Sequence, residues 1–126
     1  MDSAHAARRP VVLIVEDDLL IRLHAAELIE DAEFDVVEAS NADEAIAILE
    51  TRSDIAVLFT DIQMPGSMDG LKLAAAVKGR WPPVKIVATS GLANVRSDDL
   101  PEGGRFLPKP CNPVQLTALR ELTDRP

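Results

Sequence analysis

Short apolar runs of strand type alternate with segments of helical periodicity along almost the whole chain. The first run, residues 11–15, consists of Val, Leu and Ile alone, and the run at 55–60 is apolar up to its final threonine. Unbroken runs of this kind are typical of strands that are covered on both faces, as in a parallel sheet. We expect five strands, over residues 11–15, 34–39, 55–60, 84–89 and 105–108.

Apolar residues spaced three and four apart predict helices between these runs. The segment between the last two strands is the exception, because residues 92–104 carry no sustained apolar stripe and contain a proline and a glycine pair. We expect this fourth helix to be short, irregular or mobile. The other helical segments are residues 21–32, 42–49, 71–80 and 113–122.

Several polar residues have the positions of helix caps rather than of reactive groups. Asn41 with Glu44 three residues later forms the pattern of a capping box, and Asn112 before Pro113 marks the start of the last helix. Asp18 and Asp69 also precede helical segments and are expected to cap them. In the same way we expect His24 to be a surface or half-buried histidine without a phosphorelay role, and Trp81 to pack over a helix end.

Regular alternation of strands and helices predicts an α/β fold, in which helices cover both faces of a parallel sheet. Right-handed crossovers restrict the strand order, and we expect a flavodoxin-like, doubly wound, five-stranded parallel sheet of order 2-1-3-4-5. The 126 residues suffice for one domain, expected over residues 11–126 after a loose tail at 1–10.

Charge and composition exclude several classes of partner. Thirteen basic against 21 acidic residues leave a net charge of -8, which repels nucleic-acid phosphates, so we expect no nucleic-acid partner. The longest apolar run, residues 11–15, is too short to span a membrane. Cys111 is the single cysteine, which rules out a disulfide within the chain and suits a reducing cytoplasm. We expect a cytoplasmic protein.

Acidic residues follow two of the predicted strands. Glu16 and Asp17 come directly after the first strand, and Asp61 comes directly after the third. In the order 2-1-3-4-5 these two strands are neighbours, so their carboxyl ends should bring the three acids together. Carboxylates crowded in this way need a cation, and an all-oxygen ligand set favours Mg²⁺.

Lys109 lies between two prolines after the fifth strand, at the same predicted edge of the sheet. A carboxylate beside Mg²⁺ can attack a phosphoryl group in line, while the metal and a lysine neutralise the charge on the phosphoryl oxygens. This combination favours phosphoryl transfer to Asp61.

The chain resembles the receiver domains of two-component response regulators over nearly all of residues 11–122. Each matching motif is short, but their order and their positions on the predicted elements make the set specific. The motifs are Val15-Glu16-Asp17-Asp18, Thr60-Asp61-Ile62-Gln63-Met64-Pro65, Met68-Asp69-Gly70, Thr89-Ser90-Gly91 and Phe106-Leu107-Pro108-Lys109-Pro110.

The resemblance implies a role for each residue of the metal site. Asp61 matches the phosphoacceptor, and Glu16 and Asp17 match the acidic pair, with Asp17 as the direct metal ligand. Gln63 matches the position whose backbone carbonyl completes the metal site, so that its side chain matters less.

The resemblance also implies roles in signalling. Ser90, which Gly91 follows, matches the hydroxyl residue that bonds the phosphoryl oxygen, and Thr89 is the alternative. Lys109 matches the lysine of the family, and Phe106 takes the place of its switch aromatic.

Two segments depart from the family pattern. The loop at residues 65–70 is one residue longer than usual, which alters access to Asp61. The weak fourth helix at 92–104, after a Thr-Ser-Gly strand end, is similar to receivers paired with sensor kinases of the HWE type.

These features lead to three hypotheses of function. The first is a stand-alone response regulator, which takes a phosphoryl group from a sensor histidine kinase or a phosphotransfer protein onto Asp61 and changes shape to signal to a downstream protein. Such a protein catalyses only its own phosphorylation and dephosphorylation. The second is an aspartyl-phosphate phosphatase of the haloacid-dehalogenase type, which normally has a second Asp where this chain has Gln63. The third is a receiver-like scaffold that does not use phosphate.

Overall fold

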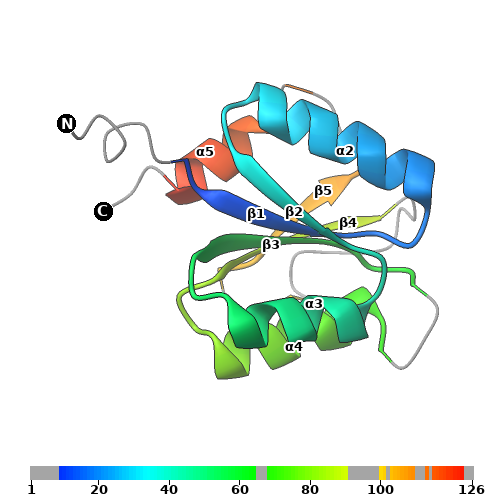
Figure 1. Ribbon diagram of the computed structural model, residues 1–126, viewed down its shortest axis with the longest axis vertical. Coiled ribbons are helices and arrows are strands. Elements are labelled where there is room, and N and C mark those ends of the chain that lie inside the picture. Colours follow the sequence, from blue (N-terminus) through cyan, green and yellow to red (C-terminus); the bar gives the residue numbers. More distant parts are fainter. Residues whose placement is uncertain are drawn as a thin grey trace.

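The computed structural model describes residues 9–64, 68–90, 100–101, 103–109, 113 and 115–123 of the chain (Figure 1). Within them, five strands form one sheet in the order β2-β1-β3-β4-β5, and every neighbouring pair is parallel. The predicted fold class and strand order are therefore confirmed. The strands are β1 (Val11–Val15), β2 (Asp35–Ala39), β3 (Ile55–Asp61), β4 (Lys85–Ser90) and β5 (Arg105–Pro108).

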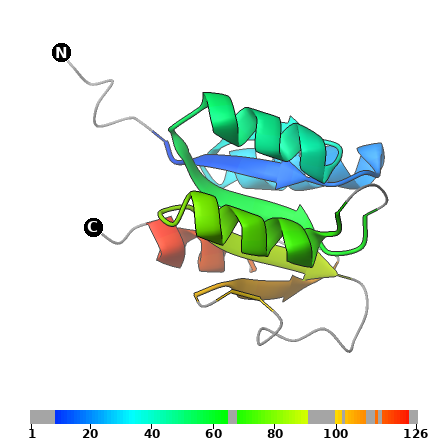
Figure 2. The ribbon, with the colours of Figure 1, turned by 90° about the horizontal axis from the view of Figure 1, so that it is seen from below.

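Helices cover both faces of this sheet. Figure 1 shows α2 and α5 on one face and α3 and α4 on the other, and Figure 2 shows α3 and α4 side by side along the sheet. The result is the three-layered arrangement that alternating strands and helices require. The described helices are α2 (Leu19–Asp31), α3 (Ala42–Thr51), α4 (Gly70–Arg80) and α5 (Thr117–Thr123).

Burial on both faces explains why β1 is apolar throughout. Leu13 and Val15 belong to the core cluster beneath α3 and α4, whereas Val12 and Ile14 belong to the cluster beneath α2 and α5. Successive residues of a strand point to opposite faces, so a strand covered on both sides needs apolar residues at every position.

Three of the four predicted helix caps are confirmed, and the fourth, Asn112, lies outside the described residues. Asp18, Asn41 and Asp69 each accept, through side-chain Oδ1, the backbone N–H three residues later, at 3.0, 2.9 and 2.9 Å. The second half of the capping box lies one residue earlier than predicted. Glu44 accepts from the backbone N–H of Ser40 at 2.7 Å and from its hydroxyl at 2.8 Å, rather than from Asn41.

The last helix begins later than predicted. Helix α5 starts at Thr117 and not at Pro113, because Gln115 and Leu116 form a turn. The backbone N–H of Leu116 bonds the Pro113 carbonyl three residues earlier, as in a tight turn, and the Gln115 side chain donates to the Pro108 carbonyl at 3.3 Å. The predicted apolar stripe is confirmed, since Leu116 and Leu119 are buried and Leu122 packs against them.

Trp81 and His24 lie as expected. Trp81 is the C-cap of α4, packs against the core, and has the Arg80 guanidinium 4.3 Å from its ring centre. His24 is exposed on α2.

Some expectations concern residues outside those described. They are the loose tail up to residue 8, the lengthened loop at 65–67, most of the irregular fourth helix, and Cys111 with Asn112. Within the described part of the chain, no helix has both the length and the apolarity needed to traverse a bilayer.

Candidate metal centre

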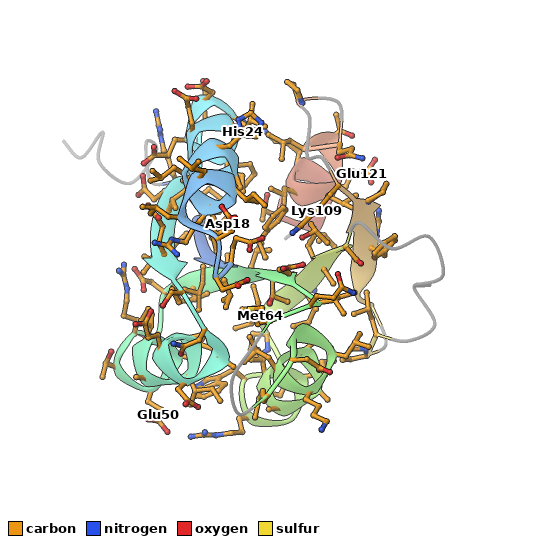
Figure 3. All side chains as sticks on the ribbon, turned by 90° about the vertical axis from the view of Figure 1, so that its right-hand side faces the viewer. Asp18, His24, Glu50, Met64, Lys109 and Glu121 are labelled. Carbon is orange, nitrogen blue, oxygen red and sulfur yellow. The ribbon has the colours of Figure 1, made fainter. Side chains whose placement is uncertain are left out.

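Three carboxylates meet at the carboxyl edge of the sheet. One oxygen from each of Glu16, Asp17 and Asp61 lies within 4.8 Å of the others. Strands β1 and β3 pair with Val15 opposite Thr60, which places their ends at the same level. Figure 3 looks onto this edge and labels Asp18, at the start of α2, and Lys109, next to β5. The structure thus brings together the acids that the predicted strand order places there.

Lys109 contacts two of these acids. Its Nζ lies 2.9 Å from Glu16 Oε1 and 3.2 Å from Asp61 Oδ1. Its backbone N–H donates to the carbonyl of Ser90 at 3.0 Å, directly after the pairing of β5 with β4. The described part of the site therefore contains an ammonium within ion-pair distance of both buried carboxylates.

One oxygen in this site lacks a hydrogen bond. Among the described residues, Asp61 Oδ1 is the single buried side-chain nitrogen or oxygen with no hydrogen-bond partner. Its contact with Lys109 Nζ is an ion pair whose geometry falls outside that of a hydrogen bond. A buried carboxylate oxygen that has an ion pair but no well-aligned hydrogen bond is not fully satisfied. The unpartnered oxygen and the convergence with Glu16 and Asp17 fit a hard divalent cation such as Mg²⁺.

Burial shifts the pKa of Glu16, Asp61 and Lys109. It raises the pKa of Glu16 and of Asp61, and the nearby acids raise both further, although Lys109 and backbone N–H groups lower them in part. Burial alone lowers the pKa of Lys109, but its hydrogen bond to Glu16 and the charges of both carboxylates leave that pKa raised overall.

These shifts predict a pH-dependent effect of Mg²⁺ on stability. The ordinary pKa values of Glu16 and Asp61 are 4.5 and 3.8, and folding raises both. Ionising these two carboxylates therefore lowers the stability of the metal-free protein as the pH rises above their ordinary pKa values and through their higher values in the folded protein. A divalent cation held by the ionised carboxylates would offset that loss. We expect Mg²⁺ to raise the melting temperature clearly at about pH 8 and little at about pH 5.

Differential scanning fluorimetry with Mg²⁺ or EDTA at both pH values measures this effect. At one pH, the difference between the Mg²⁺ and EDTA samples excludes the effect on stability of titrating groups remote from the site. Glu44 is such a group, because hydrogen bonds from Ser40 lower its pKa. An equal Mg²⁺ shift at both pH values would contradict the assignment of these carboxylates to the cation.

Thr89 and Ser90 lie at the end of β4 beside this site. Thr89 is opposite Asp61 in the strand register and is 4% exposed, and Ser90 is 1% exposed. The Ser90 hydroxyl donates to Gln63 Oε1 at 2.9 Å. The family resemblance gave the Gln63 side chain little importance. In the structure, this side chain accepts the hydrogen bond of the Ser90 hydroxyl. No motif signals this contact, because it depends on the distance between the end of β4 and the loop that follows β3.

Gly70, the first residue of α4, lies very close to the backbone at the end of β3. A Cβ at this position would lie 2.1 Å from the Asp61 carbonyl oxygen and 2.7 Å from the Ile62 Cα. The Gly70 N–H donates to the Ile62 carbonyl at 2.9 Å. The first turn of α4 thus packs directly on the backbone that carries Asp61, and only glycine leaves room for it.

Phe106 is half-buried on β5 and packs against the cluster beneath α3 and α4. It pairs in register with Ala88. Its expected role as a switch stays a prediction.

A cavity of about 450 Å³ adjoins the carboxylates. Its walls are mainly apolar side chains of β1, β3 and α2, and Glu16, Asp61 and Lys109 also line it. The buried acids are therefore reachable from outside the domain.

Comparison with known protein families shows which family the chain belongs to. Residues 12–121 match the response regulator receiver domain. The chain belongs to this family, whose members are modules of two-component signalling systems.

Individual relatives agree with this assignment. The chain is 30% identical over 119 residues to the sensor kinase CckA of Brucella abortus, covering 90% of this chain and 12% of CckA. It is 35% identical over 104 residues to the chemotaxis protein CheY of Listeria monocytogenes, covering 79% of this chain and 85% of CheY. A response regulator receiver protein of Sinorhizobium medicae has a similar crystal structure, with TM-score 0.83, 27% identity, and coverage of 92% and 95% of the two chains. The chain spans at most a quarter of three further regulators that it matches.

Proposed function

We propose that Asp61 accepts a phosphoryl group from the phosphohistidine of a sensor histidine kinase or a phosphotransfer protein. The observation that carries this proposal is the buried Asp61 Oδ1, which has no hydrogen-bond partner and lies 3.2 Å from the Lys109 ammonium beside two further carboxylates. Such a carboxylate has lone pairs available to bind a cation and to form a bond to phosphorus.

The chemistry follows from the arrangement of these groups. A carboxylate oxygen of Asp61 bonds to phosphorus as the bond from phosphorus to the donor's imidazole nitrogen breaks, and the imidazole keeps the electron pair. Glu16, Asp17, Asp61 and the backbone carbonyl of Gln63 would hold Mg²⁺, and the bound ion would neutralise charge on the phosphoryl oxygens. Lys109 supplies a second positive charge from the direction of β5.

The signal passes on through β4. The hydroxyl of Ser90, or in the alternative that of Thr89, bonds a phosphoryl oxygen. For Ser90 this requires breaking its hydrogen bond to Gln63. The phosphoryl group thereby favours one of two pre-existing conformations, and Phe106 on the neighbouring strand responds to the shift. A downstream protein recognises the new surface.

Partners and organisation are also proposals. The match to 85% of CheY supports a protein that acts as a separate receiver, formed by residues 11–126 after a short tail, and the match to part of CckA supports a place in kinase signalling. We propose a cytoplasmic regulator whose cognate kinase is of the HWE type. Its net charge of -8 favours protein partners over nucleic acid.

The phosphatase hypothesis is less well supported. A haloacid-dehalogenase enzyme needs an acid two residues after its nucleophile, and here Gln63 occupies that position and bonds Ser90. The domain is therefore proposed to modify only itself.

Mass spectrometry with a small phosphodonor tests the proposal. We expect a gain of one phosphoryl group that requires Mg²⁺, disappears with EDTA, and is cleaved by hydroxylamine as an acyl phosphate is. Borohydride reduction followed by peptide mapping should place the modification at residue 61. A Mg²⁺-independent gain or a different modified residue would refute the assignment, and sustained turnover of a phosphomonoester would support the phosphatase.

A further inference from the structure

Arg22, in the first turn of α2, bonds two different segments near the metal centre. Its Nη1 donates to the backbone carbonyl of Glu16 at 2.8 Å, and its Nε donates to Glu38 Oε1 on the edge strand β2 at 2.9 Å. Its own backbone N–H donates to the carbonyl of Asp18 at 2.9 Å. The Arg22 side chain is only 15% exposed, and its bond to the Glu16 carbonyl is partly buried, whereas its bond to Glu38 lies at the surface.

We propose that Arg22 is a positioning residue for the metal centre. The carbonyl that it bonds belongs to the peptide unit joining Glu16 to Asp17, and a peptide unit is planar. Holding the carbonyl oxygen therefore sets the orientation of the backbone from which both carboxylates project. This inference rests on the proposed function, because the centre concerned is the proposed Mg²⁺ site.

The two carboxylates depend on this backbone to different degrees. Glu16 is also held by its side chain, which accepts from the backbone N–H of Asp18 at 3.0 Å and from Lys109 at 2.9 Å. Asp17 is exposed, and no hydrogen bond among the described residues holds its carboxylate. Its direction is therefore set by the backbone, which makes the anchor supplied by Arg22 most important for Asp17.

Arg22 acts through geometry more than through charge. Its charge is paired with Glu38 at 2.9 Å. It also faces Glu44, whose pKa is lowered mainly by hydrogen bonds from Ser40 and to a smaller degree by Arg22. Both of these acids lie outside the metal centre. A guanidinium can donate to two acceptors in fixed directions, which a lysine ammonium cannot reproduce.

A purely structural role is the competing explanation. The ion pair with Glu38 joins α2 to β2, and such a link could stabilise the domain without affecting the metal centre. Glu38→Gln separates the two roles, because it removes the charge of the ion pair and leaves the bond from Arg22 to the Glu16 carbonyl. Arg22→Met removes both bonds and keeps an unbranched, largely apolar side chain in place of the aliphatic part of the arginine. Arg22→Lys keeps the positive charge but lacks the planar guanidinium that donates to both acceptors.

Calorimetric titration of each full-length variant with Mg²⁺ alone tests the inference. We expect Arg22→Met and Arg22→Lys to raise the Kd for Mg²⁺ about tenfold, as is typical for residues that orient metal ligands. Glu38→Gln should change it by less than about threefold. In the metal-free proteins, the amides of Asp17 and Asp18 should exchange with deuterium faster in both Arg22 variants than in Glu38→Gln.

Arg80→Met is the matched control. It removes an arginine ion pair, that with Glu50 at 3.0 Å, from α4 on the opposite face of the sheet, and it should leave the Mg²⁺ affinity unchanged. If Arg22→Met does not fold, Arg22→Lys decides. A wild-type Kd in the Arg22 variants, or equal weakening in Glu38→Gln, would overturn the inference while leaving the proposed function intact. Failure of the wild type to bind Mg²⁺ would instead refute the proposed function, and this inference with it.

Discussion

Asp61→Asn is expected to accept no phosphoryl group and yet to unfold at a higher temperature than the wild type. The amide lacks the nucleophilic carboxylate oxygen, so the mass gain with a small phosphodonor should vanish. The same change removes a charge that burial makes costly, since burial raises the pKa of Asp61 and its Oδ1 has no hydrogen-bond partner. We expect a gain of on the order of 1 kcal/mol, or about 4 °C in melting temperature.

Asp54→Asn is the matched control for this prediction. Asp54 is exposed and pairs with Arg52 at 2.7 Å, away from the metal centre. This variant should accept the phosphoryl group as the wild type does and change the stability by no more than about 0.5 kcal/mol. Mass spectrometry with Mg²⁺ present measures the phosphoryl gain, and thermal unfolding without Mg²⁺ measures the stability. The same mass gain in Asp61→Asn would move the acceptor elsewhere, and a lower melting temperature would show that the buried carboxylate does not cost stability.

Gly70→Ala should destabilise the domain strongly. The added methyl group would meet the Asp61 carbonyl oxygen at 2.1 Å, which is backbone and cannot rotate away as a side chain can. Either α4 or the end of β3 must move, at a cost of about 3 kcal/mol. Because the displaced backbone carries Asp61, the variant should also accept a phosphoryl group more slowly, even under conditions in which it is folded. Urea denaturation and the rate of phosphoryl gain measure the two effects.

Gly79→Ala is the corresponding control in the same helix. A Cβ at this position would meet nothing within 4 Å, and alanine restricts the unfolded chain more than glycine does. This variant should gain about 0.5 to 1 kcal/mol of stability and keep the wild-type rate of phosphoryl gain. If Gly70→Ala were as stable as the wild type, the close approach of α4 to the backbone of Asp61 would not exist in solution.

Local features were predictable because their causes lie within a few residues. The caps formed by Asp18, Asn41 and Asp69 each use a backbone N–H three positions on. The late start of α5 shows the limit of such inference. Asn112 and Pro113 have the composition of a helix start, but the Gln115 side chain bonds the end of β5, and the chain forms a turn before the helix begins.

The meeting of the site residues was also predictable, although it is not local. Glu16 and Lys109 are 93 residues apart and lie 2.9 Å from each other. Parallel strands joined by right-handed crossovers leave few possible orders, and each of these orders collects the carboxyl ends of the strands at one edge. Motifs placed directly after strands therefore converge whatever the details of packing.

The sequence by itself determined the alternating elements, the parallel sheet, the family and the residues at the edge where the site forms. Only the tertiary structure decided which side chains touch there. The bond of Ser90 to Gln63 spans 27 residues, that of Arg22 to Glu38 spans 16, and the contact of Gly70 with Asp61 needs the approach of a helix to a strand end. Hydrophobic period and capping are properties of short segments, whereas these contacts depend on register and packing between elements, which no single segment encodes.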